Sequence, residues 1–198
     1  MADAGRELLI LGILRRAPLS AYDVELAVRA HAPLFRLLKR GNVYYTLERL
    51  AAQRFLARRD VPAQRGRLAT KAVYRIAAPG ERRFRELLRA TVLDLQAGDT
   101  ALEIAYVLLG QLPRDETLAL MQARHEAIQS QERRLRRLYG DVVKRGGAAY
   151  LSASHAFNRV RAEQRFLAES IALLHDAKWS PSWTSDDGPV DPERRLRF

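Results

Sequence analysis

Apolar residues recur at helical spacing over two long stretches in the second half of the chain. Four of them are seven residues apart in the stretch 115–143: Met121, Ile128, Leu135 and Val142. The second stretch, 150–177, carries a similar row at alternating spacings of three and four: Phe157, Val160, Gln164, Leu167, Ile171 and Leu174. Sustained spacing of this kind is typical of long helices that pack along a seam.

These stretches predict an antiparallel helical hairpin that dimerises. The first spans 29 residues, which is about 43 Å of helix, and the connection to the second is short. We expect that so thin a hairpin cannot bury both seams internally, and that a second copy of the chain covers them in a symmetric dimer. The residues assigned to dimerisation are Met121, Ile128, Leu135, Val142, Phe157, Val160, Leu167, Ile171 and Leu174.

The first half of the chain predicts helices followed by a β-hairpin. Helices are expected over 6–16, from Ser20 to about Arg29, and from Asn42 onward. Ser20 and Asp23 form an S-x-x-D capping pattern, and Tyr22, Leu26 and Val28 are expected to face inward.

Two short strands and one more helix complete this half. Strands are expected at 55–61 and 71–76, with a Pro- and Gly-containing loop at 62–69 between them. Pro79-Gly80 is expected to close the hairpin before a helix over 81–95.

The helix after Gly41 has two different faces. Asn42 is expected to cap it, and Val43, Leu47 and Leu50 form a core-facing stripe. The hydrogen-bonding side chains are expected on the opposite face: Asn42, Tyr45, Thr46 and Arg49. Tyr44 lies at the edge between the faces.

The excess of positive charge is confined to this first half. Residues 1–96 hold 19 Lys and Arg against 9 Asp and Glu, whereas residues 97–198 hold 15 against 14. Arginine makes up 30 of the 34 basic residues, a ratio that a GC-rich genome also favours, but such a bias does not explain the asymmetry. A compact domain of this charge attracts polyanions.

Three helices followed by a basic hairpin are the arrangement of a winged helix-turn-helix. A B-DNA major groove admits one helix, and the flanking phosphates accept Arg and Lys. We expect the third helix to enter the groove and Arg65, Arg67 and Lys71 of the wing to contact phosphate. Arg49 is assigned to DNA in preference to a salt bridge with Glu48 or Asp60, and Tyr45 to stacking on a sugar or a thymine methyl group.

Three ordered runs carry a resemblance to a known family. They are ELLILGIL followed by PLSAYDV at 7–14 and 18–24, GNVYYTLERL at 41–50, and KAVYRIAAPG at 71–80. Their order and spacing over residues 6–96 resemble those of PadR-type transcriptional regulators, which run roughly LxLLILGLL, PLHGYEL, GTLYPALxRL and RKxYxLTxxG. The second half resembles, in length and pattern, the virulence-activator-like helical domain of the longer members.

The resemblance implies a function and a set of partners. It implies a regulator that binds an inverted-repeat operator in double-stranded DNA, more often a repressor, with the Tyr44 hydroxyl on a phosphate. It also implies relief by a small aromatic or lipophilic effector. Ala21, Asn42 and Tyr45 replace the usual Gly, Thr and Pro, so the base preference is not expected to transfer.

The overall prediction is a mainly α chain with a small β-hairpin wing. A winged helix-turn-helix DNA-binding domain is expected at 1–96, a helical dimerisation domain at 99–177 and a flexible tail at 178–198. The alternative is a winged-helix interaction module that binds an acidic protein or RNA.

Several other classes are not expected. The chain has no cysteine, and no two histidines have helical metal-ligand spacing, so no metal site or cofactor is expected. No catalytic motif is present, so an enzyme is not expected. No apolar run approaches the ~20 residues of a membrane span and no secretion signal is recognised, so we expect a cytoplasmic protein without a membrane partner.

Overall fold

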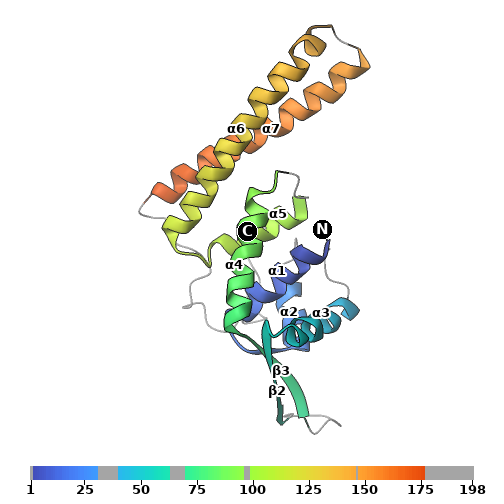
Figure 1. The fold of residues 1–198 in the computed structure, drawn as a ribbon, viewed down its shortest axis with the longest axis vertical. Helices are drawn as coiled ribbons and strands as arrows, with labels where there is room; N and C mark the ends of the chain where they lie inside the picture. The colour runs from blue at the N-terminus through green and yellow to red at the C-terminus, as the bar shows by residue number, and fades with distance from the viewer. Residues whose placement is uncertain (1, 31–39, 63–69, 96–98, 146, 177–198) are drawn as a thin grey trace. The chain divides into compact units, whose positions relative to one another are not determined.

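A computed structural model of the chain describes residues 2–30, 40–62, 70–95, 99–145 and 147–176 (Figure 1). These residues form two compact units. The first contains residues 2–91 and 99–111, and the second contains residues 92–95 and 112–176. The predicted tail therefore lies outside the described residues.

The described residues of the first unit form five helices, and apolar side chains fill its core. They are α1 (Ala2–Leu14), α2 (Ala21–Ala30), α3 (Arg40–Ala52), α4 (Ala78–Leu93) and α5 (Asp99–Leu109). The largest fully buried side chains on these helices come from α1, α3, α4 and α5: Leu8, Ile10, Leu11, Leu14, Leu47, Leu50, Phe84, Leu88, Ile104 and Leu108. The helical periodicity predicted for the first half is thereby confirmed.

Helix α5 packs on α1, which corrects the predicted boundary at residue 99. A Cβ at Gly12 of α1 would lie 2.5 Å from Cδ2 of Leu108 on α5, so the missing side chain lets the helices approach. The Gln111 amide also donates to the Gly12 carbonyl at 3.1 Å. The sequence assigned residues 99–109 to the helical domain, because apolar periodicity alone does not say which core a helix joins.

The capping pattern of α2 is confirmed, but its inward face differs from the prediction. The Ser20 hydroxyl accepts from the Asp23 amide at 3.3 Å, and the Asp23 carboxylate accepts from the Ser20 amide at 3.2 Å. Ala21, Val24 and Val28 are buried at spacings of three and four. Tyr22 and Leu26, which we expected inside, are 64% and 40% exposed.

Within the part of the chain that the structure describes, three short strands form an antiparallel sheet in the order β1–β3–β2. The predicted wing is confirmed as β2 (Leu56–Pro62) and β3 (Thr70–Ile76), paired with Arg58 opposite Tyr74. The edge strand β1 (Leu19–Ser20) was not predicted, because two residues carry no alternation signal. In Figure 1 the wing extends away from α1, α2 and α3 of its own unit.

Helix α4 begins three residues before the predicted start. The Glu81 amide donates to the carbonyl of Ala77, so Pro79 and Gly80 lie in the first turn instead of closing the hairpin. Proline is tolerated there because the first amides of a helix have no intrahelical acceptor. Gly80 is required by contact, since a Cβ would lie 2.2 Å from the carbonyl oxygen of Phe55.

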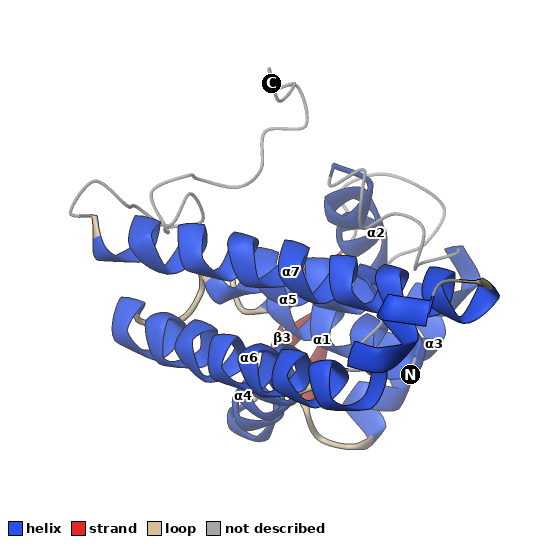
Figure 2. Cartoon of the chain, turned by 90° about the horizontal axis from the view of Figure 1, so that it is seen from above, coloured by secondary structure: helices blue, strands red, loops and turns tan. Residues whose placement is uncertain are grey.

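The second unit is a hairpin of two long helices, as predicted. Helices α6 (Arg114–Arg145) and α7 (Ala148–His175) lie side by side in both Figure 1 and Figure 2. Arg124 of α6 is buried and donates to Glu163 of α7 at 2.8 Å and to the Val92 carbonyl at 2.7 Å. This guanidinium therefore joins both helices to Val92 at the end of α4, which belongs to the same unit.

The expectation that a second copy must cover both seams is wrong for five of the nine dimerisation residues. These five are buried within the single chain: Met121, Ile128, Val160, Leu167 and Leu174. Leu135, Phe157 and Ile171 are half-buried, and the Val142 side chain lies outside the described residues. The physical reason is that the two predicted seams face each other inside the hairpin.

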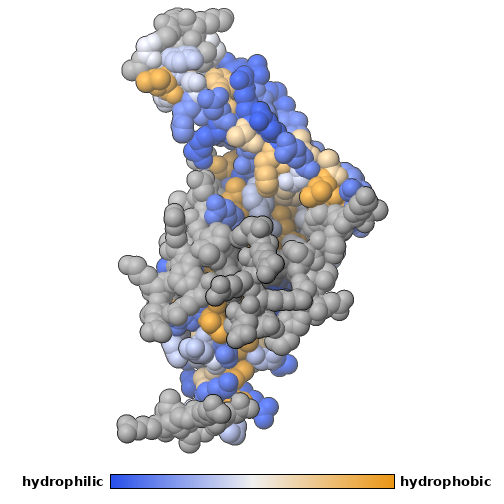
Figure 3. Space-filling model, turned by 180° about the vertical axis from the view of Figure 1, so that it is seen from behind, coloured by the Kyte–Doolittle hydropathy of each residue, from blue (hydrophilic) through white to orange (hydrophobic). Residues whose placement is uncertain are grey.

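Apolar side chains remain on the outside of this hairpin. They are Leu138, Tyr139, Tyr150, Leu151, Phe166 and Leu173, between 39% and 70% exposed. Figure 3 shows apolar patches that interrupt an otherwise hydrophilic helical surface. Among the described residues, no helix is both long and apolar enough to cross a membrane.

Candidate nucleic-acid interface

Helix α3 presents two tyrosines to solvent, of which the sequence predicted an outward position only for Tyr45. Val43, Leu47 and Leu50 are buried, whereas Tyr44 and Tyr45 are 57% and 68% exposed. Tyrosine is enriched at binding interfaces because it supplies both an apolar ring and a hydroxyl for contact. Tyr44, which we placed at the edge of the two faces, thus lies on the outer one.

Thr46 was expected on the outer face and is fully buried, so that placement was wrong. Residues 43, 46, 47 and 50 form one stripe at spacings of three and four, and Thr46 is the polar member of it. The residue type suggested a DNA-reading side chain, but the helical rotation places it in the core. Its burial removes it from the candidate surface.

Arg49 contacts a carboxylate that the sequence reasoning did not consider. Its guanidinium lies 3.3 Å from the carboxylate of Glu7 on α1, whereas the salt-bridge partners considered from the sequence were Glu48 and Asp60. The Glu7 side chain is buried and also accepts from Arg83 of α4 at 2.7 Å. Arg49 therefore ties α3 to its neighbours, and its contact with DNA stays a prediction.

Three of the predicted DNA-binding side chains lie outside the described residues: Asn42, Arg65 and Arg67. The backbone at Asn42 is helical, and α3 begins at Arg40, so the prediction that Asn42 caps this helix is wrong.

The wing has two chemically different faces. Directly paired residues share a face of a β-ladder, and successive residues alternate between faces. Arg58 and Tyr74 are therefore on one side. Arg59, Lys71 and Arg75 are on the other, where all three are exposed and form no ion pair with any residue that the structure describes.

Arg59 and Arg75 were missed by the sequence reasoning, which treated Arg58-Arg59 as an ordinary solvated pair. The alternation of side chains along the two strands could have found them. Once Arg58 is known to pair with Tyr74, residues 59, 71 and 75 all fall on the other face. Together with Lys71 they make a cationic wing face, defined here as Arg59, Lys71 and Arg75. Exposed cations that share one face of a hairpin can contact neighbouring phosphates.

The opposite face of the wing is neutralised and joined to α3. The Tyr74 hydroxyl donates to Glu48 of α3 at 2.5 Å, and Arg58 donates to the same carboxylate at 3.2 Å and to Asp60 at 3.4 Å. Burial and the bond to Glu48 raise the pKa of Tyr74 to about 12. The adjacent Glu48 and Asp60 raise the pKa of Arg58, so this face keeps its charges internally paired.

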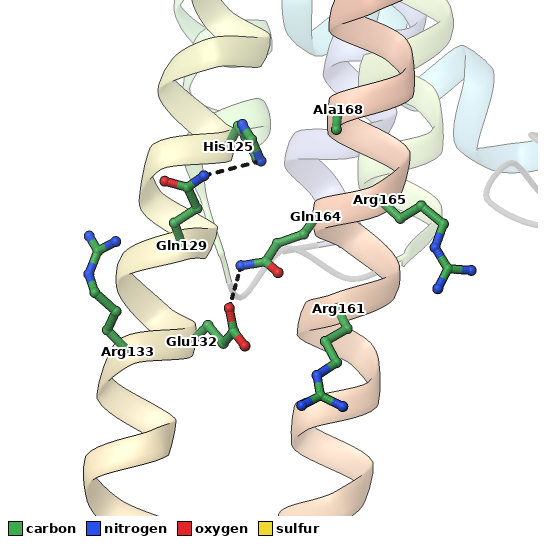
Figure 4. Close-up of a pocket in the computed structure, with 8 residues that line it drawn as sticks. All are labelled: His125, Gln129, Glu132, Arg133, Arg161, Gln164, Arg165 and Ala168. Carbon is green, nitrogen blue, oxygen red and sulfur yellow. Dashed lines mark hydrogen bonds between the residues drawn. The ribbon is translucent and has the colours of Figure 1, made fainter.

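A shallow groove lies between α6 and α7 in the second unit (Figure 4). Gln164 and Glu132 point toward each other across it, whereas Arg133 and Arg165 point outward on opposite sides. Hydrogen bonds from Gln164 at 2.9 Å and Arg136 at 2.6 Å lower the pKa of Glu132. Among the described residues no group of His, Asp or Glu is arranged to hold a metal ion.

Comparison with known proteins gives weak similarities. No family model and no curated protein matches the sequence. Among solved structures, the chain is similar to Bacillus subtilis PadR in complex with operator DNA, with 22% identity, 85% of this chain and 98% of that chain covered, and a TM-score of 0.40. The chain is also similar to PadR of the same organism in complex with p-coumaric acid. That match has 21% identity, covers 87% of this chain and 99% of that chain, and has a TM-score of 0.38.

A third similar structure is the PadR-like transcriptional regulator BC1756 from Bacillus cereus, with 18% identity, 85% and 94% coverage and a TM-score of 0.37. The winged-helix arrangement of the first unit is defined by its own element order and sheet register, given above.

Proposed function

We propose that the protein is a sequence-specific DNA-binding transcriptional regulator of the PadR type. The observation that carries this proposal is the combination, within one compact unit, of exposed Tyr44 and Tyr45 on α3 with the cationic wing face. The sequence resemblance over residues 6–96 supports the same function.

Each part of the surface has a distinct chemical task in this proposal. Helix α3 enters the major groove, where Asn42 hydrogen-bonds a base edge and Tyr45 contacts a sugar or a thymine methyl group. The Tyr44 hydroxyl donates to a phosphate. The cationic wing face, with Arg65 and Arg67 of the wing loop, neutralises flanking phosphates and sets affinity and not base preference.

Selection of bound duplexes from a random pool tests this proposal, followed by titration of variants against the selected duplex. Arg75→Ala is expected to weaken binding to every duplex alike. It is also expected to reduce the salt slope, which is the steepness with which the logarithm of the binding constant falls with the logarithm of salt concentration, by about 0.9, the value for one phosphate contact. Tyr45→Ala is expected to change the preference among sequences. The matched control is Arg133→Ala on α6, which removes the same charge and is expected to change neither.

The dimer remains part of the proposal, with a changed surface. The outer stripe of α7, defined as Leu151, Ala162, Phe166 and Leu173, offers exposed apolar or small side chains along the helix. A second copy seated on this stripe would bury it and present two α3 helices to an inverted repeat.

Sedimentation of the wild type and of Leu173→Arg tests the dimer. The wild type is expected at twice the chain mass of 22.5 kDa and the variant at the chain mass. A wild type that sediments as a monomer at micromolar concentration overturns the proposed dimer. The DNA-binding proposal is tested separately, by the duplex selection described above.

Repression, and its relief by a small aromatic or lipophilic effector, complete the proposal. An effector acts only through a difference in its affinity for the DNA-binding and non-binding states. Titration of small aromatic acids into the protein–duplex complex is expected to release the duplex for at least one of them.

A further inference from the structure

One carboxylate of α3 contacts both strands of the wing. Oε1 of Glu48 accepts from the Tyr74 hydroxyl of β3 at 2.5 Å. Nη1 of Arg58 on β2 donates to Oε1 and Oε2 of the same carboxylate at 3.2 and 3.4 Å. A single side chain of the helix thus holds the two strands at one level, because Arg58 and Tyr74 are direct partners in the ladder.

At this level Tyr74 is buried and β1 pairs with Tyr74 and Val73, whereas the part of the wing beyond it has little other support. The base of the wing is fixed by buried Leu56 and by the close approach of Gly80 to Phe55. The third strand, β1, pairs only with Tyr74 and Val73, so residues 70–72 pair with β2 alone. A two-stranded ribbon twists and bends more readily than a wider sheet, so its direction depends on the contacts near its base.

These contacts contribute more to geometry than to stability. The Glu48 and Arg58 side chains are 51% and 47% exposed, and exposed ion pairs add little to folding free energy. Lys71 lies three residues from Tyr74, about 10 Å along the strand. A tilt of 10° at Tyr74 would therefore displace Lys71 by about 2 Å, which is enough to break a hydrogen bond to phosphate.

We infer that Glu48 is a positioning residue for DNA binding. Through Tyr74 and Arg58 it fixes the direction of the wing relative to α3, so that the cationic wing face meets phosphates while α3 occupies the groove. The carboxylate is engaged with the wing and does not read a base. This inference rests on the proposed function.

The first test measures the direction of the wing without DNA. The chain has no cysteine, so a pair of spin labels can be placed at exposed Gln53 and Thr70 by substitution alone. The distance distribution is expected to broaden in Glu48→Ala and Tyr74→Phe, and to be intermediate in Glu48→Gln, which keeps an acceptor for Tyr74. Tyr22→Phe is the matched control, since it removes an exposed hydroxyl, and an unchanged distribution in Tyr74→Phe overturns the inference.

The second test is a double-mutant cycle on the selected duplex, with Tyr74→Phe and Lys71→Ala. In the wild-type background, Lys71→Ala is expected to reduce the salt slope by about 0.9. In the Tyr74→Phe background, the same substitution is expected to reduce the salt slope by clearly less. If the wild type selects a duplex but the effects of Tyr74→Phe and Lys71→Ala on the salt slope are additive, this inference is overturned and the proposed function stands. A change of base preference in Glu48→Gln overturns this inference in the same way. A wild type that selects no duplex overturns the proposed function and this inference with it.

Discussion

Replacing Arg124 by methionine is expected to destabilise the second unit strongly. The side chain is only 5% exposed, and it donates to the Glu163 carboxylate at 2.8 Å and to the Val92 carbonyl at 2.7 Å. Methionine keeps most of the apolar length but offers no donor. The substitution therefore removes the Arg124 counter-charge from the partly buried Glu163 carboxylate and a hydrogen-bond donor from a carbonyl at the end of α4.

The magnitude follows from these two losses. An orphaned buried acceptor costs about 1–3 kcal/mol, and breaking a buried ion pair by removing one partner costs about 3–5 kcal/mol when burial is complete. Glu163 is 24% exposed, so the ionic loss is reduced by solvent, and we expect a total of about 3 kcal/mol.

Arg136→Met provides the matched control on the same helix. Arg136 also pairs with a glutamate, Glu132, at 2.6 Å, but it is 62% exposed. Helical surface pairs of this spacing contribute about 0.3–0.5 kcal/mol. Urea unfolding followed by circular dichroism measures both variants, and free energies of unfolding within about 1 kcal/mol of each other would refute the reasoning.

Three further predictions concern the stability of single elements. Gly80→Ala places a Cβ 2.2 Å from the Phe55 carbonyl and is expected to cost about 3 kcal/mol or more, whereas Gly140→Ala, with nothing within 4 Å, is expected to add about 0.5–1 kcal/mol. Thermal unfolding of both checks the difference in sign. Ser20→Ala removes the cap of α2 and is expected to cost about 1 kcal/mol in urea unfolding, and a cost near zero contradicts the capping role. The pKa of Tyr74 is raised to about 12, so its hydroxyl stabilises the fold fully below pH 10 and loses that contribution as the pH rises from 10 to 12. The stability difference between wild type and Tyr74→Phe is therefore expected to shrink over this range, and a constant difference contradicts the assignment.

Features set by local spacing could be predicted from the sequence. The stripe of Val43, Leu47 and Leu50, the capping box of Ser20 and Asp23, and the long α6/α7 hairpin all follow from periods or pairs a few residues apart. Thr46 shows the limit of residue type as a guide, because a hydroxyl placed at the inward rotation of a helix is buried whatever its chemistry suggests.

Features set by long-range contact could not be predicted. Glu7 meets Arg49 and Arg83 across 42 and 76 positions of the chain, and no local pattern brings them together. The seams of α6 and α7 were assigned to a second copy, since a sequence pattern shows that a stripe is buried but not against what. Predicting the cationic wing face would have required the register of the two strands, which the pairing of Arg58 with Tyr74 defines.

Binding of the wild-type chain to three labelled nucleic acids of equal length tests the central proposal most directly. They are the selected inverted-repeat duplex, a scrambled DNA duplex and an RNA duplex, titrated by fluorescence anisotropy at several salt concentrations. We expect the selected duplex to bind at least about 1,000-fold more tightly than the scrambled one, with both affinities falling linearly in log salt. Equal affinity for the two DNA duplexes, or tighter binding of the RNA, would contradict a sequence-specific regulator of transcription.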